Sequence, residues 1–270
     1  MILSTPSPAL APGGGLLLVS VALVLYLLAG LPLAILRRFS VAALLAAWVL
    51  HGLLLVIDIG GLGQSEPGAR LGFAPVLSMT VWLVVAVYIV ESRLVPLPSV
   101  RQWLAPAGLL AVLVCAVFPG EFRPITSRLA PLHFALGVGA YGLFGVAVLH
   151  AFMLDAAERR LRARGPGPGP GMPLLLLEKI TFRFVEAGFA VLTATLVLGI
   201  VNTVHWRWSD RKAVFSLMAW AVFAALLAGR HLRGWRGRQA TRWLYAGTAL
   251  LLLAYVGSRF VLEVILGRTA

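Results

Sequence analysis

Cysteine and charged residues are the two classes of residue that this sequence has little of. The 270 residues include 1 cysteine, Cys115, and Asp, Glu, Lys and Arg together make up 12%. One cysteine cannot form an internal disulfide or a Cys-x-x-Cys thiol relay. The sequence also has no internal repeat, and the segments between its apolar runs are too short for a soluble domain. These absences leave an integral membrane protein as the class to consider.

Hydrophobic residues dominate instead and make up 60% of the chain. A helix needs about 20 mainly apolar residues to cross a bilayer. Apolar runs predict spans near residues 15–36, 40–62, 73–90, 102–118, 130–153, 184–204, 213–229 and 243–266. We therefore expect an all-α integral membrane protein, with about eight transmembrane helices in a single polytopic domain over residues 1–270.

The distribution of basic residues predicts how the chain is oriented. A net charge of +13 would suggest nucleic acid as the partner of a soluble protein. Here the odd-numbered connections carry 15 Lys and Arg, whereas the even-numbered connections and the termini carry 7. The positive-inside rule then predicts cytoplasmic odd connections and both termini outside, with the lipid bilayer and not nucleic acid as partner. No basic residue precedes the first apolar run and Arg37-Arg38 follow it, which favours an uncleaved first span.

The longest predicted connection lies near residues 155–173. It contains Gly165-Pro-Gly-Pro-Gly-Pro-Gly171, in which glycine and proline alternate. Such a run forms neither a helix nor a strand ladder, so we expect a flexible cytoplasmic loop.

Two histidines suggest a ligand site, because a histidine is costly in a membrane unless something holds it. His133 and His205 lie at predicted span ends on the same, outer side. A neutral imidazole is a good ligand for haem iron, so the two side chains could clamp one haem b. The alternative is that both are interfacial histidines hydrated at the level of the lipid headgroups.

His51 lies near the middle of the second predicted span. Asp58 follows it by seven residues, which returns to the same helix face. A structural hydrogen bond to a backbone carbonyl, a metal or second haem site, and a proton relay all remain open for His51. We expect His150 to be structural and His231, in a basic connection, to be solvated.

Arg259, Trp206 and Trp208 complete the candidate haem-binding residues. Arg259 lies inside the last span, and Glu263 one turn further on offers an ion pair. The functional alternative is that Arg259 binds a haem propionate. Trp206 and Trp208 suit either the aromatic belt of the membrane interface or stacking on a porphyrin.

Several short motifs occur in a familiar order. They are Asp210, Lys212, Ser216-Leu217 and Trp220, then Gly234-Trp-Arg-Gly237, then Ala254-Tyr-x-Gly-Ser-Arg259, together with His133 and Tyr141. In this pattern the chain resembles the cytochrome c assembly superfamily, which includes CcsA, ResC, CcmC and HemX. Over nearly its full length it resembles the YpjD inner-membrane subfamily. The resemblance implies a bacterial inner-membrane location, haem handling in cytochrome c assembly, and other assembly or membrane proteins as partners.

The sequence also departs from the haem-handling members. Ser209 replaces a tryptophan of their Trp-rich outer loop, and Glu263 lies near the place of their second outer histidine. We therefore expect binding rather than bond formation, and assign neither a catalytic residue nor an enzymatic activity. One alternative is an ion-handling or accessory protein without haem, using Asp58, His51, Glu186 and Glu91. Another is a structural subunit that docks through its basic cytoplasmic loops.

Overall fold

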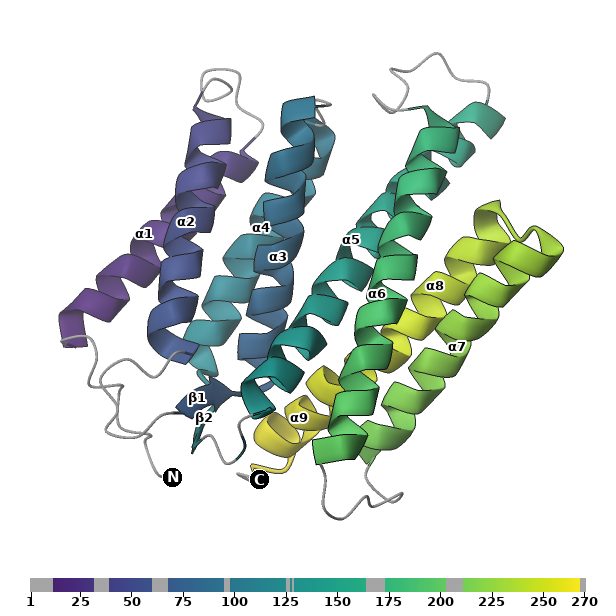
Figure 1. Cartoon of the computed structure of the whole chain (residues 1–270). Helices are drawn as coiled ribbons and strands as arrows, with labels where there is room; N and C mark the ends of the chain where they lie inside the picture. Colours follow the sequence, from purple (N-terminus) through teal and green to yellow (C-terminus); the bar gives the residue numbers. More distant parts are fainter. Residues whose placement is uncertain are drawn as a thin grey trace. The chain divides into compact units, whose positions relative to one another are not determined.

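The computed structural model describes residues 12–31, 39–59, 68–94, 98–124, 127, 129–163, 173–202 and 211–267. Nearly all of these residues are helical (Figure 1). They divide into two compact units, and the main boundary between these units in the sequence lies near residue 126. Unit 1 contains α1 (Pro12–Gly30), α2 (Ser40–Ile59), β1 (Gly68–Leu71), α3 (Phe73–Leu94), α4 (Pro98–Val117) and β2 (Glu121–Pro124). Unit 2 contains α5 (Ala130–Arg162), α6 (Leu174–Asn202), α7 (Arg211–Arg233), α8 (Gly237–Leu252), η2 (Leu253–Gly257), α9 (Ser258–Phe260) and η3 (Val261–Ile265).

The expected helices are present. Seven of them are long and apolar enough to cross a membrane, and α1 contributes a shorter apolar stretch, Gly15–Gly30. Each of the eight predicted spans overlaps one of these helices, so the prediction of a helical membrane protein is confirmed, and the described residues are nearly all helical. The placement of both termini outside remains a prediction.

The predicted loop near 155–173 is shorter than expected. Helix α5 continues to Arg162, and α6 begins at Leu174. Residues 155–162 are mainly Ala, Glu, Leu and Arg, which favour a helix. The carboxylate of Asp155 also accepts hydrogen bonds from Thr241 and Tyr245 on α8, which holds this extension in place. The Gly/Pro run at 165–171 lies outside the described residues.

Unit 1 is held together by close aromatic contacts. Helix α1 packs against α2 and α4. Its Tyr26 ring lies so near Gly108 that a Cβ at Gly108 would come within 2.4 Å of it. Trp48 of α2 and Trp82 of α3 stack at 4.9 Å, and each indole N–H donates to the other residue's carbonyl, at 3.1 and 2.9 Å. These contacts bring the four helices of unit 1 together and satisfy the indole donors of Trp48 and Trp82.

A short antiparallel ribbon, which the sequence did not predict, closes one end of unit 1. Strand β1 pairs with β2, so that Gly68 lies opposite Pro124 and Leu71 opposite Glu121. Gly120 has a positive φ of 76° just before β2, a conformation that glycine adopts without strain. The ribbon therefore fixes the start of α3 beside the end of α4.

The core of unit 2 is built around one pair of stacked rings. Phe144 of α5 and Phe223 of α7 lie 3.8 Å apart and nearly parallel. Gly188 of α6 and Gly247 of α8 face these rings, where a Cβ would come within 3.1 and 2.7 Å of ring carbons. Small residues at such positions let membrane helices approach closely. The four long helices of unit 2 therefore converge on this pair.

We expect Gly247→Ala to destabilise the protein by about 1–3 kcal/mol, because the new methyl group would collide with the Phe223 ring. The measurement is the thermal unfolding midpoint in detergent. Gly139→Ala is the control, because the nearest side-chain atom would be 3.9 Å away. Equal midpoints for the two variants would contradict this account of the core.

Candidate functional site

His133 lies in the first turn of α5, after Pro131. Its backbone N–H donates to the Leu129 carbonyl at 2.9 Å, and its ring faces α6, where a Cβ on Gly199 would be 3.1 Å from Cε1. The ring atom Nδ1 is shielded from solvent and has no hydrogen-bond partner among the described residues. A buried polar atom without a partner is costly, so the position favours a ligand or an additional hydrogen-bonding group.

Helix ends gather around His133. Helix α5 begins, α6 ends and α7 begins at one end of unit 2, which we call the His133 end (Figure 1). His205, Trp206 and Trp208 belong to the connection between α6 and α7. They lie outside the described residues, as does the side chain of Asp58 in unit 1. The pairing of His133 with His205, and stacking by the two tryptophans, stay predictions.

Arg259 is buried, with 3% of its surface exposed. Its Nη1 lies 3.9 Å from Oε1 of Glu263, so the ion pair expected from the sequence is present. That separation is too long for a hydrogen bond. Neither Nε nor Nη1 of Arg259 has a hydrogen-bond partner within the described part of the chain. The guanidinium therefore keeps donors that an anionic group could use.

A cavity of about 350 Å³ opens beside the C-terminal segment. Its lining comes from α7 and from the segment η2–α9–η3: Lys212, Phe215, Leu253, Gly257, Ser258, Val261, Leu262 and Leu266. Most of these side chains are apolar and one is cationic. Volumes of this order are typical of small-molecule sites, and the lining suits an amphipathic anion.

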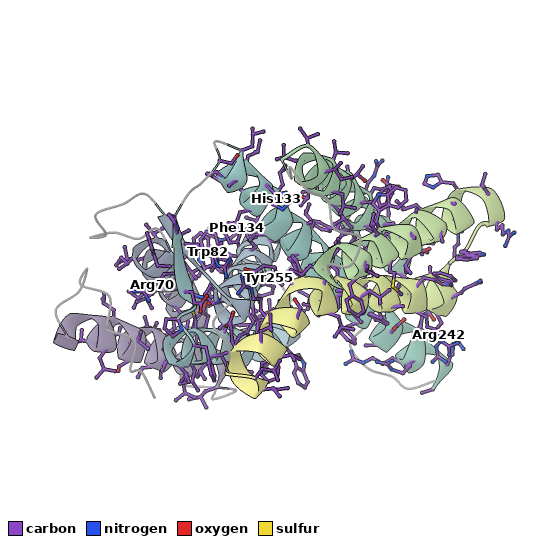
Figure 2. The ribbon with its side chains drawn as sticks, turned by 90° about the horizontal axis from the view of Figure 1, so that it is seen from below. Arg70, Trp82, His133, Phe134, Arg242 and Tyr255 are labelled. Atoms are coloured by element: carbon purple, nitrogen blue, oxygen red, sulfur yellow. The ribbon has the colours of Figure 1, made fainter. Side chains whose placement is uncertain are left out.

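Tyr255 links the cavity to Arg259. Lys212 Nζ lies 5.8 Å from the centre of the Tyr255 ring, and the Arg259 guanidinium carbon lies 5.9 Å from it. Tyr255 belongs to η2, one of two π-helical segments in the last span, and such segments are frequent at functional sites. Tyr141 of α5 donates a hydrogen bond to the carbonyl of Leu251, just before η2. Figure 2 shows His133 on α5 and Tyr255 on this C-terminal segment.

Comparison with known proteins identifies the family. Residues 14–266 match the Cytochrome C assembly protein family. The chain belongs to this family. It is 30% identical to the inner membrane protein YpjD of Escherichia coli K12 over 242 residues, which cover 85% of this chain and 88% of that protein.

Members of the family named for cytochrome c biogenesis match shorter parts of the chain. The protein CcsA of Synechococcus elongatus is 30% identical over 148 residues, 53% of this chain and 42% of that protein. The CcsA of Picosynechococcus is 37% identical over 86 residues, 30% of this chain and 25% of that protein. No solved structure matches the chain. With seven long apolar helices among its described residues, this cytochrome c assembly family member is an inner-membrane protein.

His51 of this family member does not fit a haem ligand. Its Nδ1 lies 3.0 Å from the Tyr26 hydroxyl and its Nε2 lies 2.8 Å from Ser78 Oγ, so both ring nitrogens are occupied. The adjoining cavity, lined in part by Ser78 and Cys115, has about 20 Å³, room for about one water molecule. Of the alternatives for His51, the hydrogen-bonded one is present with two side chains in place of a backbone carbonyl, and this arrangement leaves neither ring nitrogen open for a haem iron.

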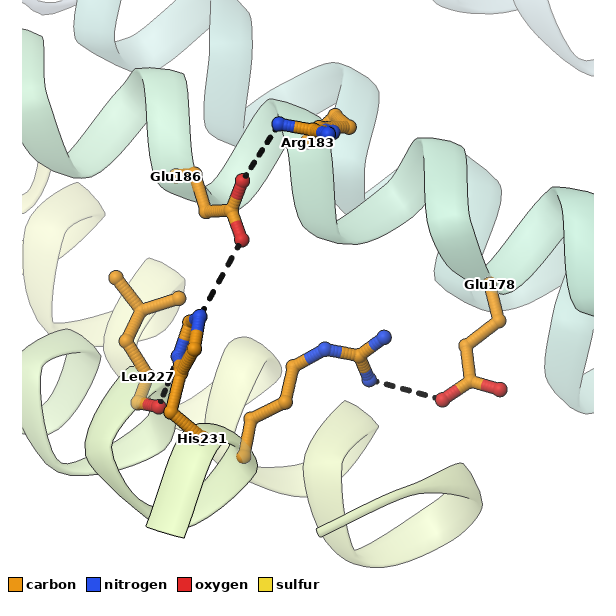
Figure 3. A network of polar contacts seen from close by, with 6 residues as sticks. Glu178, Arg183, Glu186, Leu227 and His231 are labelled. Atoms are coloured by element: carbon orange, nitrogen blue, oxygen red, sulfur yellow. Dashed lines mark hydrogen bonds and ion pairs between the residues drawn. The ribbon is translucent and has the colours of Figure 1, made fainter. Parts of the chain in front are cut away.

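The remaining histidines have ordinary roles. His150 is buried. Its Nδ1 lies 2.9 Å from the Val146 carbonyl oxygen, and its ring stacks on Phe184. His231 is exposed, as expected, and lies 2.8 Å from the Leu227 carbonyl (Figure 3). Among the described residues, no three His, Cys, Asp or Glu side chains are grouped as a metal site would require.

The sequence interpretation missed the partners of His51 and most of the cavity lining. Tyr26 and Ser78 come from helices adjacent to α2 in the chain, but nothing in a single apolar helix indicates its rotation toward a neighbour. The cavity left one usable signal. Gly257-Ser258 places two small residues in the last span, and they line the cavity together with Lys212 from the first turn of α7.

We expect Tyr26→Phe to destabilise the protein by about 1–3 kcal/mol, because it leaves His51 Nδ1 buried without a partner. Thermal unfolding in detergent measures the loss. Ser20→Ala is the control, since it removes an exposed hydroxyl that bonds only its own helix. A Tyr26→Phe protein as stable as the control would show that His51 does not depend on this hydroxyl.

Proposed function

We propose that this inner-membrane protein binds haem b at the His133 end of unit 2 and retains or delivers it during cytochrome c assembly. The observation that carries the proposal is the shielded Nδ1 of His133, which has no partner among the described residues. Membership of the cytochrome c assembly family supports haem as the ligand. Other assembly or membrane proteins are the proposed partners.

Each proposed haem contact uses a different property of the chain. His133 offers an imidazole nitrogen to the iron, and Gly199 leaves space beside its ring. His205 is the proposed second ligand. Arg259 and Lys212 would hold the propionates, because both are cations set among apolar side chains at the same end of the unit. Bound haem would supply a redox-active iron, and the residues named here bind and orient it.

The proposed orientation places the His133 end outside. The opposite end of unit 2 carries the extended basic ends of α5 and α7, each with three basic residues in its last turn. The positive-inside rule assigns that end to the cytoplasm. A haem held at the His133 end would then lie near the outer surface of the inner membrane.

Purified protein is expected to show a Soret band, sharp α and β bands on reduction, and near-stoichiometric haem in a pyridine haemochrome assay. His133→Ala and His205→Ala should each abolish the low-spin spectrum, because each removes an axial ligand. His231→Ala is the matched control, since it removes an exposed histidine from the other end of the unit. Unchanged haem in folded, monodisperse His133→Ala protein would refute the proposal.

Arg259 has a test of its own. We expect Arg259→Gln to weaken haem binding roughly tenfold or more, because a hydrogen bond to a charged group contributes about 1.5–3 kcal/mol. Glu263→Gln removes the same ion pair but keeps the guanidinium. Haem titration of both variants separates the two roles. Equal affinities would assign Arg259 to the ion pair alone.

A further inference from the structure

Trp235 holds the turn between α7 and α8 in place. It consists of Gly234-Trp-Arg-Gly237, with positive φ angles of 66° and 55° at the two glycines. The backbone N–H of Trp235 donates a hydrogen bond to the Gly229 carbonyl at 3.2 Å. The Trp235 ring covers Gly229, where a Cβ would come within 2.4 Å of it, and lies 5.4 Å from the Trp243 ring. These contacts fix the backbone from which the neighbouring side chains project.

Four exposed arginines surround this turn. They are Arg233, Arg236, Arg238 and Arg242, which we call the arginine cluster. Arg238 and Arg242 lie one turn apart on α8 and therefore share a face. Within the described part of the chain, none of the four forms an ion pair. Figure 2 labels Arg242, which projects from α8.

The acidic residues at this end of unit 2 are already engaged. Glu178 lies 2.9 Å from Arg230, and Glu186 lies near Arg183 and His231 (Figure 3). Glu158 lies near Arg162 and against Gly237, at the start of α8. Asp155 accepts hydrogen bonds from Thr241 and Tyr245. The positive charge of the arginine cluster is therefore left for an external anion.

Apolar side chains beside the cluster indicate what kind of anion. Leu232 is 84% exposed, and Trp243, whose ring packs near that of Trp235, is 36% exposed. A soluble phosphate would leave both side chains in water, whereas a lipid covers them with its acyl and glycerol groups. Tryptophan is also enriched at the level of lipid headgroups. The turn joins two helices that are long and apolar enough to cross the membrane, so headgroups are within reach.

From this arrangement we infer that the arginine cluster and Trp243 bind the phosphate headgroup of an anionic phospholipid. Arginine suits this role because its planar guanidinium donates two hydrogen bonds to phosphate oxygens. The orientation of the chain in the membrane depends only on how many Lys and Arg lie near the ends of the spans, not on how they are arranged. It does not need a turn whose backbone is held by a tryptophan ring packed over a glycine. The inference does not depend on haem binding.

The test is lipid retention by the full-length protein, measured by native mass spectrometry after exchange into mixed phosphatidylglycerol and phosphatidylcholine. The wild type is expected to retain phosphatidylglycerol preferentially. A hydrogen bond to a charged group contributes about tenfold or more to binding, so replacing all four arginines with glutamine should lower the preference at least about tenfold. Trp235→Leu keeps every charge and should also lower the preference, because it releases the turn.

The matched control replaces four other exposed basic residues at the same end with glutamine: Arg159, Arg160, Arg162 and Lys179. It loses the same charge and should keep the wild-type preference. An equal loss in the control, or no loss in either the quadruple or the Trp235→Leu variant, would overturn the inference. So would displacement of the lipid by millimolar inorganic phosphate, which would identify a soluble anion. The haem spectrum of every variant should stay unchanged, so this test and the haem proposal fail independently.

Discussion

The absence of water from the bilayer interior is the constraint on which this structure depends. A polar side chain there must find its partner within the protein, because hydrocarbon offers none. Unit 1 meets the constraint with Tyr26, His51 and Ser78, which bond in one chain across three helices. The two tryptophans of α2 and α3 meet it by exchanging hydrogen bonds with each other's carbonyls. These pairings hold helices together and also fix their rotation.

The same constraint makes the exceptions informative. His133 Nδ1 and two nitrogens of Arg259 in unit 2 have no hydrogen-bond partner among the described residues, and the same holds for the buried Nε of Arg101 in unit 1. Elsewhere in that unit the hydroxyls of Thr181, Thr193 and Thr195 bond carbonyls of their own helix. Trp220 bonds Thr193. The lack of a partner supports a functional explanation for His133 and Arg259 because both lie at the end of unit 2 that holds the cavity.

The sequence predicted the spans because a run of about 20 apolar residues has few other uses in a protein. It also selected His133 and Arg259, since ionisable residues are rare at membrane depth. It could not predict that His51 would meet Tyr26 and Ser78, because that contact depends on how three apolar helices rotate toward each other. The π-helical segments were equally hidden. The first of them, η2, closely follows the Leu251 carbonyl that accepts a hydrogen bond from Tyr141, 110 residues earlier in the chain.

The two ends of unit 2 carry different kinds of side chain, and the length of the helices keeps them apart. Its helices hold a shielded imidazole and an apolar cavity with a single lysine at the His133 end. At the other end, the same helices present a basic, tryptophan-ordered turn. The stacked Phe144 and Phe223 lie between them, where two glycines let α6 and α8 approach the rings. The two ends therefore share one packed centre but no functional side chain, so the residues of the basic turn can be changed without removing any candidate haem ligand.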